Sequence, residues 1–162
     1  MIHYKTEEEI EVMKESCQLA AEVLIMIEPY VKPGVTTERL DQICHDYIVS
    51  KGAVPSPLNY RGFPKSICSS VNEEICHGIP SDRKLRNGDI VNLDITTYLK
   101  GFHGDTSRTF FVGSPRKKAA KLVEVCKEAL QRGIEVVKPG AKLGDIGASI
   151  QNFAEGHGYS IV

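Results

Sequence analysis

An internal repeat limits how this chain can fold more than any other feature of its sequence. The tetrapeptide Val-Lys-Pro-Gly begins at Val31 and begins again at Val137, 106 positions further along. Around both copies, apolar residues recur at helical spacing, and a glycine comes after them at Gly52 and, at the same offset, at Gly158. A Pro-Gly turn between two helices is common, so the tetrapeptide alone is a weak signal. The matched flanking residues favour an internal duplication of a helix, a turn and a second helix.

The first copy carries the clearest helix signals. Thr6 and Glu9 stand at capping-box spacing, and the pattern predicts a long amphipathic helix that ends near Pro29. Thr36 is placed to cap a second helix, which Gly52 ends. The expected buried face of the first helix contains Ile10, Met13, Cys17, Ala20, Ala21, Leu24 and Ile27.

The two copies differ after their second helix. Beyond Gly52, segments rich in β-branched and aromatic residues predict strands at 66–71, 90–98 and 106–112. Beyond Gly158 there are only four residues. The second copy therefore lacks the strands that complete the first.

The length of the chain suits a single domain. With 162 residues, of which 41% are hydrophobic, it can bury one ordinary core. We expect one α/β (α+β) domain over residues 1–162, with a first pseudo-repeat at 13–112 and the start of a second at 119–162. Compared with the length of the first pseudo-repeat, about half of the second pseudo-repeat is missing.

Charge and cysteine content exclude several partners and locations. The 20 basic and 21 acidic residues nearly cancel, so no strong field favours nucleic acid or an anionic membrane. The N-terminus is acidic and amphipathic, and no run of about 18 apolar residues is present, which argues against secretion and membrane insertion. Five cysteines without close pairs predict reduced, mostly buried thiols in a cytoplasmic protein.

Segment 90–110 carries the residues with the clearest chemical meaning. It predicts a β-hairpin with its turn near Lys100 and Gly101. With a two-residue turn there, opposed residues have opposite parity, so Asp94 and Asp105 project from the same face, directly opposite or one pair apart. Two such carboxylates repel each other unless a proton or a cation lies between them. Hard divalent metal ions take oxygen ligands of this kind.

Each of these residues also has a plainer interpretation. Asp94 can lie at a strand end and Asp105 can cap a turn, with both carboxylates in water. His77 lies in a loop between strands, where an imidazole can act as acid, base or ligand, but a lone histidine is more often structural. His103 shares the parity of Asp105, and we take it as a supporting or structural residue. From the residues alone, the metal site and the solvated carboxylates remain alternatives.

Longer strings of residues resemble one known family. They stand at 59–66, 71–80 and 88–107, in the order and at the spacing of type I methionine aminopeptidases, and the likeness runs through all 162 residues. A match of this length is more specific than any single motif and favours the metal interpretation of Asp94 and Asp105. The strings are Asn-Tyr-Arg-Gly-Phe-Pro-Lys-Ser, Val-Asn-Glu with Cys-His-Gly-Ile-Pro after it, and Gly-Asp-Ile-Val-Asn-Leu-Asp through Gly-Phe-His-Gly-Asp-Thr-Ser.

The resemblance implies a fold and a set of residue roles. Family members have the pita-bread fold, two pseudo-symmetric α/β halves around a dinuclear metal site, so we expect a complete first half and a truncated second half. The resemblance makes Asp94 a ligand of one metal ion and Asp105 a bridge between two. It makes His77 the catalytic and substrate-binding histidine that contacts the scissile peptide. An apolar, polarisable wall suits a methionine thioether, and the resemblance gives that pocket Tyr60, Phe63 and Cys68.

The implied activity is removal of the N-terminal methionine from nascent proteins, with two divalent metal ions as cofactors. Fe, Mn, Co and Zn all suit such a site, so the sequence does not choose among them. The expected partners are new polypeptides near the ribosome, and we expect the full-length enzyme to be a cytoplasmic monomer without direct nucleic-acid or membrane binding. In the family, one histidine and two glutamates complete the metal site beyond the position of Val162, so we expect this chain alone to be inactive.

Two alternatives belong to other functional classes. A non-catalytic pita-bread protein could bind peptides, ribosomes or other proteins, but a pure binding module has no physical need for paired carboxylates. A creatine-directed or proline-directed hydrolase of the same fold is the other alternative. The methionine-pocket strings, and the lack of an extra N-terminal domain, argue against that hydrolase.

Overall fold

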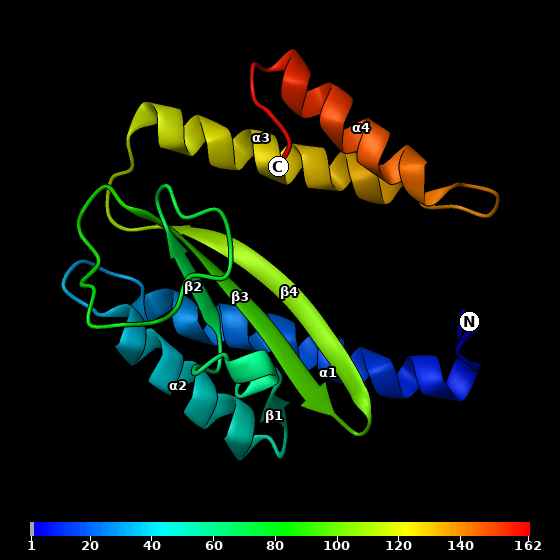
Figure 1. Ribbon diagram of the computed structural model, residues 1–162, viewed down its shortest axis with the longest axis horizontal. Helices are drawn as coiled ribbons and strands as arrows, with labels where there is room; N and C mark the ends of the chain where they lie inside the picture. The colour runs from blue at the N-terminus through cyan, green and yellow to red at the C-terminus, as the bar shows by residue number, and fades with distance from the viewer. Residues whose placement is uncertain (1) are drawn as a thin grey trace. The chain divides into compact units, whose positions relative to one another are not determined.

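Residues 2–162 are described by the computed structural model, and they divide into two units, one extending to Pro115 and the other from Arg116 to Val162. Figure 1 shows the helices and strands of both units. Within residues 2–162, no helix is both long enough and apolar enough to cross a membrane. A single domain with a first pseudo-repeat at 13–112 and a second from 119 stays a prediction.

The first unit begins with two capped helices, as the sequence predicts. These are α1 (Glu7–Ile27) and α2 (Thr37–Ser50), separated by the short helix η1 (Glu28–Tyr30). The backbone N–H of Glu9 donates to Thr6 Oγ1 at 3.2 Å, and the backbone N–H of Thr6 donates to Glu9 Oε2 at 2.9 Å. Both halves of the capping box are therefore present.

The predicted buried face of α1 is partly wrong. Ala20, Leu24 and Ile27 are buried as expected, but Cys17 and Ala21 are exposed. The helix is rotated from the predicted face, and its buried side includes Ser16, whose backbone lies against Gly104 of the hairpin. The buried residues of α1 are Ser16, Leu19, Ala20, Val23, Leu24 and Ile27.

A four-stranded antiparallel sheet comes after the helices, with β3 (Ile90–Leu99) at its centre. On one side, β3 pairs along its whole length with β4 (Phe102–Phe111). On the other side, it pairs with β2 (Cys68–Val71) and, near its C-terminal end, with the two-residue strand β1 (Val54–Pro55). Figure 1 shows the long β3–β4 hairpin curving across α1. The sequence did not predict β1, and β4 begins four residues earlier than expected.

The register of the hairpin agrees with the sequence prediction. Ile90 opposes Phe111 and Leu99 opposes Phe102, which leaves Lys100 and Gly101 as a two-residue turn. Lys100 has φ 52° and Gly101 has φ 93°, the positive values that a tight hairpin turn requires at both positions. Opposed residues thus have opposite parity along the whole hairpin.

The hydrophobic core lies between the two helices and one face of the sheet. On β3, every second residue is buried, from Val91 through Leu93 and Ile95 to Thr97. The residues between them, including Asp94 and Thr96, are half-buried and face the other way. The core from α1, α2 and the loops includes Val23, Ile27, Leu40, Cys44, Ile48, Ile67 and Leu85.

Gly104 on β4 marks the closest approach of the sheet to α1. A Cβ atom at Gly104 would lie 2.3 Å from the backbone carbonyl carbon and oxygen of Ser16. Thr97, which opposes Gly104 on β3, donates its hydroxyl to the Ser16 carbonyl oxygen at 2.9 Å. Ser16 is itself fully buried, with its hydroxyl 3.2 Å from the Thr97 carbonyl oxygen. This contact holds α1 against the hairpin. Its two hairpin residues, Thr97 and Gly104, are near the aspartates in sequence: Thr97 comes three residues after Asp94, and Gly104 directly precedes Asp105.

The second unit is a pair of helices, α3 (Lys117–Glu135) and α4 (Leu143–Gly156). Gly133 of α3 packs against Ile150 of α4, where a Cβ atom would meet the isoleucine side chain at 2.9 Å. A shift of 106 residues carries α2 onto the bounds of α4. The same shift relates Gly34, with φ 89°, to Gly140, with φ 88°. These matches support the internal duplication, which we keep as a proposal.

The cysteines are free, as expected, but they are not mostly buried. Cys44 and Cys68 are buried, whereas Cys17, Cys76 and Cys126 are exposed. Burial raises the pKa of the Cys44 thiol, and the negative charge of Asp41 adds to this shift. The expectation of mostly buried thiols was therefore wrong, because Cys17 and Cys126 lie on exposed faces of helices and Cys76 lies in the loop after β2.

Candidate metal and peptide site

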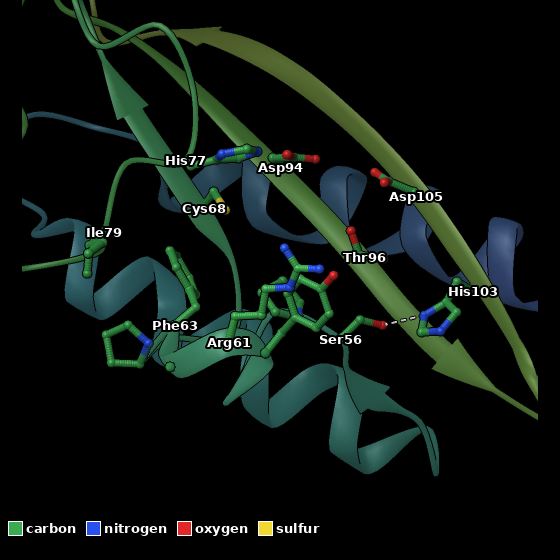
Figure 2. Close-up of a pocket in the computed structure, with 14 residues that line it drawn as sticks. Ser56, Arg61, Phe63, Cys68, His77, Ile79, Asp94, Thr96, His103 and Asp105 are labelled. Carbon is green, nitrogen blue, oxygen red and sulfur yellow. Dashed lines mark hydrogen bonds between the residues drawn. The ribbon is translucent and has the colours of Figure 1, made fainter.

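A pocket of about 680 Å³ opens on the face of the sheet that points away from α1 and α2. The six residues to which the resemblance gives roles all line this one pocket, although they come from five separate parts of the chain: residues 60–63, β2, the loop after β2, β3 and β4. Figure 2 shows several of them pointing into the same space. The six are Tyr60, Phe63, Cys68, His77, Asp94 and Asp105.

The two aspartates project from neighbouring strands toward the same side, which confirms the parity prediction. Asp94 opposes Ser107, and Asp105 opposes Thr96, so the two carboxylates are diagonal neighbours one pair apart. Burial raises the pKa of Asp94, and the negative charge of Asp105 raises it further. His77 acts in the opposite direction and lowers it. A cation between the carboxylates would relieve their repulsion.

His77 approaches Asp94 from the loop that connects β2 to β3. Its backbone has φ 54°, a left-handed conformation that is uncommon for a residue with a side chain. The next residue, Gly78, fastens this loop to β2: its carbonyl accepts from the Ser69 N–H at 2.8 Å, and its N–H donates to Ser70 Oγ at 3.1 Å. A Cβ atom at Gly78 would lie 2.2 Å from the Ser69 carbonyl oxygen. Only glycine allows this approach, which brings His77 beside Asp94 in Figure 2.

An apolar wall stands next to the carboxylates. Cys68 on β2 is the direct neighbour of Asp94 across the sheet, and Tyr60, Phe63 and Ile79 line the pocket around it. Burial, together with the smaller effect of the negative charge of Asp94, raises the pKa of the Cys68 thiol to about 11. The thiol is therefore neutral near pH 7. It suits contact with an apolar ligand better than nucleophilic attack.

The sequence interpretation missed the residue that anchors this wall. Asp41 of α2 is buried, and its Oδ1 accepts from the backbone N–H groups of Ser66 at 2.8 Å and Ile67 at 3.0 Å. Burial raises the pKa of Asp41, which these two hydrogen bonds partly oppose. Lys65 in the same loop donates to Glu38, also on α2, at 2.6 Å. The signal in the sequence is the spacing of Glu38 and Asp41, which share one side of a helix.

His103 occupies the far end of the pocket. Its Nδ1 lies 2.8 Å from Ser56 Oγ, as drawn in Figure 2, and its ring centroid is 4.8 Å from that of Tyr98. Ser56 in turn donates its backbone N–H to the Thr96 carbonyl oxygen at 2.9 Å. The imidazole therefore links β4 to the segment after β1. Its predicted supporting role stays a prediction.

Comparison with known proteins identifies the family. A family model described as metallopeptidase family M24 matches residues 11–162. The chain belongs to metallopeptidase family M24. Among curated proteins, it is 53% identical to a methionine aminopeptidase of Rickettsia prowazekii and 54% identical to one of Escherichia coli K12. Each match covers 99% of this chain and 62% of the relative, so the chain spans about 62% of the length of these relatives.

Solved structures of methionine aminopeptidases share this fold. The crystal structure of methionine aminopeptidase from Rickettsia prowazekii matches with a TM-score of 0.99 at 54% identity, covering 100% of this chain and 65% of the other. The Thermotoga maritima enzyme matches with a TM-score of 0.96 at 33% identity, covering 66% of that chain. The expected pita-bread class, mixed α/β with an antiparallel sheet, is thereby confirmed. A prolidase from Pyrococcus furiosus, at 23% identity and a TM-score of 0.82, shares the fold alone.

The M24 family consists of metallopeptidases, and the pocket of this member contains two neighbouring carboxylates, those of Asp94 and Asp105. Within residues 2–162, no group of three or more His, Cys, Asp and Glu side chains is arranged to hold a metal ion. The two aspartates are hard oxygen donors that suit divalent ions. The described part of the chain thus provides a pair of carboxylates but no cluster of three or more ligands.

Proposed function

We propose that this chain forms part of a type I methionine aminopeptidase, which hydrolyses the first peptide bond of polypeptides that begin with methionine. One observation carries the proposal: Asp94 and Asp105 project from neighbouring strands into a pocket whose remaining wall is largely apolar. Carboxylates beside an apolar pocket suit a peptide whose free amino group and apolar side chain belong to the same first residue, because the carboxylates attract the amino group and the pocket takes the side chain. The names of the similar proteins support the same activity.

Asp94 and Asp105 fit a divalent metal ion by charge and by ligand type. Burial and the nearby Asp105 raise the pKa of Asp94, and a bound cation would oppose both effects by stabilising the charged carboxylate. We propose that Asp94 binds one ion and that Asp105 bridges two. Bound divalent ions supply Lewis acidity and lower the pKa of a bound water. Carboxylate ligands accept Fe, Mn, Co and Zn, so the availability of each metal in the cell decides which one is bound.

The remaining pocket residues bind and orient the peptide. Tyr60, Phe63 and Cys68 surround the methionine side chain and exclude water from it. His77 contacts the scissile peptide, where its imidazole can donate a hydrogen bond or hold a proton for the leaving amine. The docked loop at Gly78 keeps the imidazole beside Asp94. No covalent intermediate is required, which agrees with a neutral thiol at Cys68.

The 162 residues alone are proposed to bind metal weakly and to release no methionine. Two carboxylates bind a metal pair poorly when no imidazole or further acid completes the site. The complete enzyme would act as a cytoplasmic monomer on the N-terminal methionine of new polypeptides near the ribosome. Direct contact with nucleic acid or membranes is not part of this proposal.

Metal binding by single variants tests this function. Mn²⁺ titrations, monitored by the paramagnetic broadening of NMR signals, should show binding to the wild-type chain at the β3–β4 hairpin. Asp94→Asn and Asp105→Asn should each weaken this binding by about tenfold or more, since each removes one charged ligand. Asp82→Asn is the matched control, because Asp82 is exposed and outside the pocket lining.

Peptide binding supplies the second half of the test. The amide of Met-Ala-Ser should bind more tightly than the amide of Ala-Ala-Ser, and Phe63→Ala should reduce that difference. Equal Mn²⁺ binding by the wild type and both aspartate variants would contradict the proposed metal site. Equal binding of the two peptides would contradict the methionine pocket. Release of methionine by the unmodified chain would overturn only its expected inactivity.

A further inference from the structure

Arg61 is a charged residue of the pocket that the proposed chemistry does not use. It belongs to the short helix η2 (Tyr60–Gly62), and Figure 2 shows its side chain reaching into the pocket from the side opposite the aspartates. Its guanidinium carbon lies 5.4 Å from the centroid of the Tyr60 ring. Within residues 2–162, no carboxylate oxygen forms an ion pair with it. Because arginine stays protonated at physiological pH, the pocket holds a fixed positive charge that faces any ligand.

The backbone around Arg61 is held in an uncommon conformation. Arg61 has φ 49°, and it stands between Asn59 with φ 66° and Gly62 with φ 85°. A non-glycine residue keeps a left-handed conformation only where the surrounding structure imposes it, and such residues gather at binding sites. Here the Asn59 N–H donates to the Phe63 carbonyl at 2.8 Å, and the Phe63 N–H donates to the Tyr60 carbonyl at 2.9 Å. This compact turn sets where the arginine side chain begins.

The charges in the pocket are separated. No guanidinium nitrogen of Arg61 lies within 4.0 Å of a carboxylate oxygen of Asp94 or Asp105. The guanidinium is therefore not paired with the aspartates. In the proposed binding mode, the amino end of the peptide lies at Asp94 and Asp105. The residues after the first peptide bond then leave the pocket past its other walls, where Arg61 can meet them.

We propose that Arg61 favours peptides that carry an acidic side chain shortly after the first peptide bond. This inference depends on the proposed function, because it requires the peptide to bind with its N-terminus at the aspartates. A guanidinium can donate two parallel N–H bonds to a carboxylate, which also carries the opposite charge. A glutamine side-chain amide has the same shape as the glutamate carboxylate but no charge, so it binds a guanidinium more weakly. Arg61 is exposed, so the preference is modest, about two- to fivefold in affinity, and salt weakens it.

Binding of two isosteric peptides to the 162-residue chain tests the inference. The probes are the amides of Met-Ala-Glu-Ser and Met-Ala-Gln-Ser, which differ by one charged group, and calorimetry or NMR titration at low salt gives their affinities. The glutamate peptide should bind about two- to fivefold more tightly to the wild type. Arg61→Gln should remove this difference, and Arg61→Lys should keep part of it. Neither substitution introduces or removes a glycine, so the left-handed backbone is equally strained in all three proteins.

Arg39→Gln is the matched control. Arg39 is an exposed arginine of α2 outside the pocket lining, so its loss should leave the preference for glutamate unchanged. Equal affinity of the wild type for both peptides overturns the inference, as does a preference that survives Arg61→Gln. The N-acetylated forms of both peptides distinguish a failure of the Arg61 inference from a failure of the proposed function, because acetylation blocks the amino group that the proposed function places at the aspartates. If blocking the amino group leaves all affinities unchanged, the proposed binding mode is wrong, and the role of Arg61 is overturned with it.

Discussion

The two faces of the β3–β4 hairpin use one backbone for different purposes. On the face toward α1, Leu93 and Ile95 are fully buried, while on the opposite face Asp94 and Thr96 line a pocket. Because successive side chains of a strand point to opposite faces, a single register places both sets. The inner face stabilises the fold, and the outer face holds groups that are costly to bury. Substitutions on the two faces should therefore separate stability from binding.

The largest expected effect is on the inner face. Leu93→Ala should lower the free energy of unfolding by about 3 kcal/mol, because it leaves a cavity at a fully buried site. Urea denaturation monitored by circular dichroism measures this change. Thr96→Ala, on the outer face of the same strand, should change stability by less than about 1 kcal/mol. A similar loss for both substitutions would mean that the outer face also carries the fold.

Gly104 tests the contact between the hairpin and α1. Gly104→Ala should lower the free energy of unfolding by about 2 to 3 kcal/mol, since the new Cβ atom would collide with the backbone of Ser16. Gly147→Ala is the control on α4, where a Cβ atom meets nothing within 4 Å. There the change should stabilise the chain by up to about 1 kcal/mol, through the helix propensity of alanine. Thermal unfolding of both variants distinguishes the collision from a general effect of added alanine.

Asp41 connects the helix layer to the pocket wall, so it should affect both properties. Asp41→Ala removes the acceptor of the Ser66 and Ile67 N–H groups and should cost about 2 kcal/mol of stability. It should also weaken binding of a methionine peptide, because the loop beside Phe63 loses its anchor. Asp41→Asn keeps an acceptor oxygen and should restore most of both. If Asp41→Ala weakens stability but not peptide binding, the loop does not need this anchor to form the wall.

The smallest effect concerns the charge on the outer face. Burial and Asp105 raise the pKa of Asp94 in the folded chain, so protonated Asp94 favours folding below its unfolded pKa. That contribution is lost as pH rises through the folded pKa. Without metal, Asp94→Asn should therefore raise the free energy of unfolding at pH 7, by less than about 1 kcal/mol, because the site is partly open to solvent. The difference in the free energy of unfolding between the wild type and Asp94→Asn should vanish in acid. Urea denaturation at several pH values measures it. A lower stability of Asp94→Asn at pH 7 would contradict this prediction.

Several features of this protein depend only on residues that are close in sequence. The capping box at Thr6 and Glu9, the Lys100-Gly101 turn and the alternation along the hairpin each depend on a few neighbouring positions. Such local patterns specify backbone geometry directly. Parity alone therefore put Asp94 and Asp105 on one face before any tertiary contact was known.

Other features depend on partners far away in the chain. Ser16 meets Thr97 across 81 positions, and this contact decides which face of α1 is buried, against the face that helical spacing suggested. Asp41 anchors a loop 25 positions later, and its spacing from Glu38 indicates a shared side of the helix but does not identify the loop that binds there. His77 reaches Asp94 only because Gly78 docks on β2.

The sequence by itself determined the helices, the hairpin and the shared face of its two aspartates, because periodicity and turn chemistry act over a few residues. Only the tertiary structure decided how α1 is rotated, what holds the pocket wall and which side chains surround the carboxylates. These depend on close packing between distant segments, which is a property of the folded chain and not of any one stretch of it.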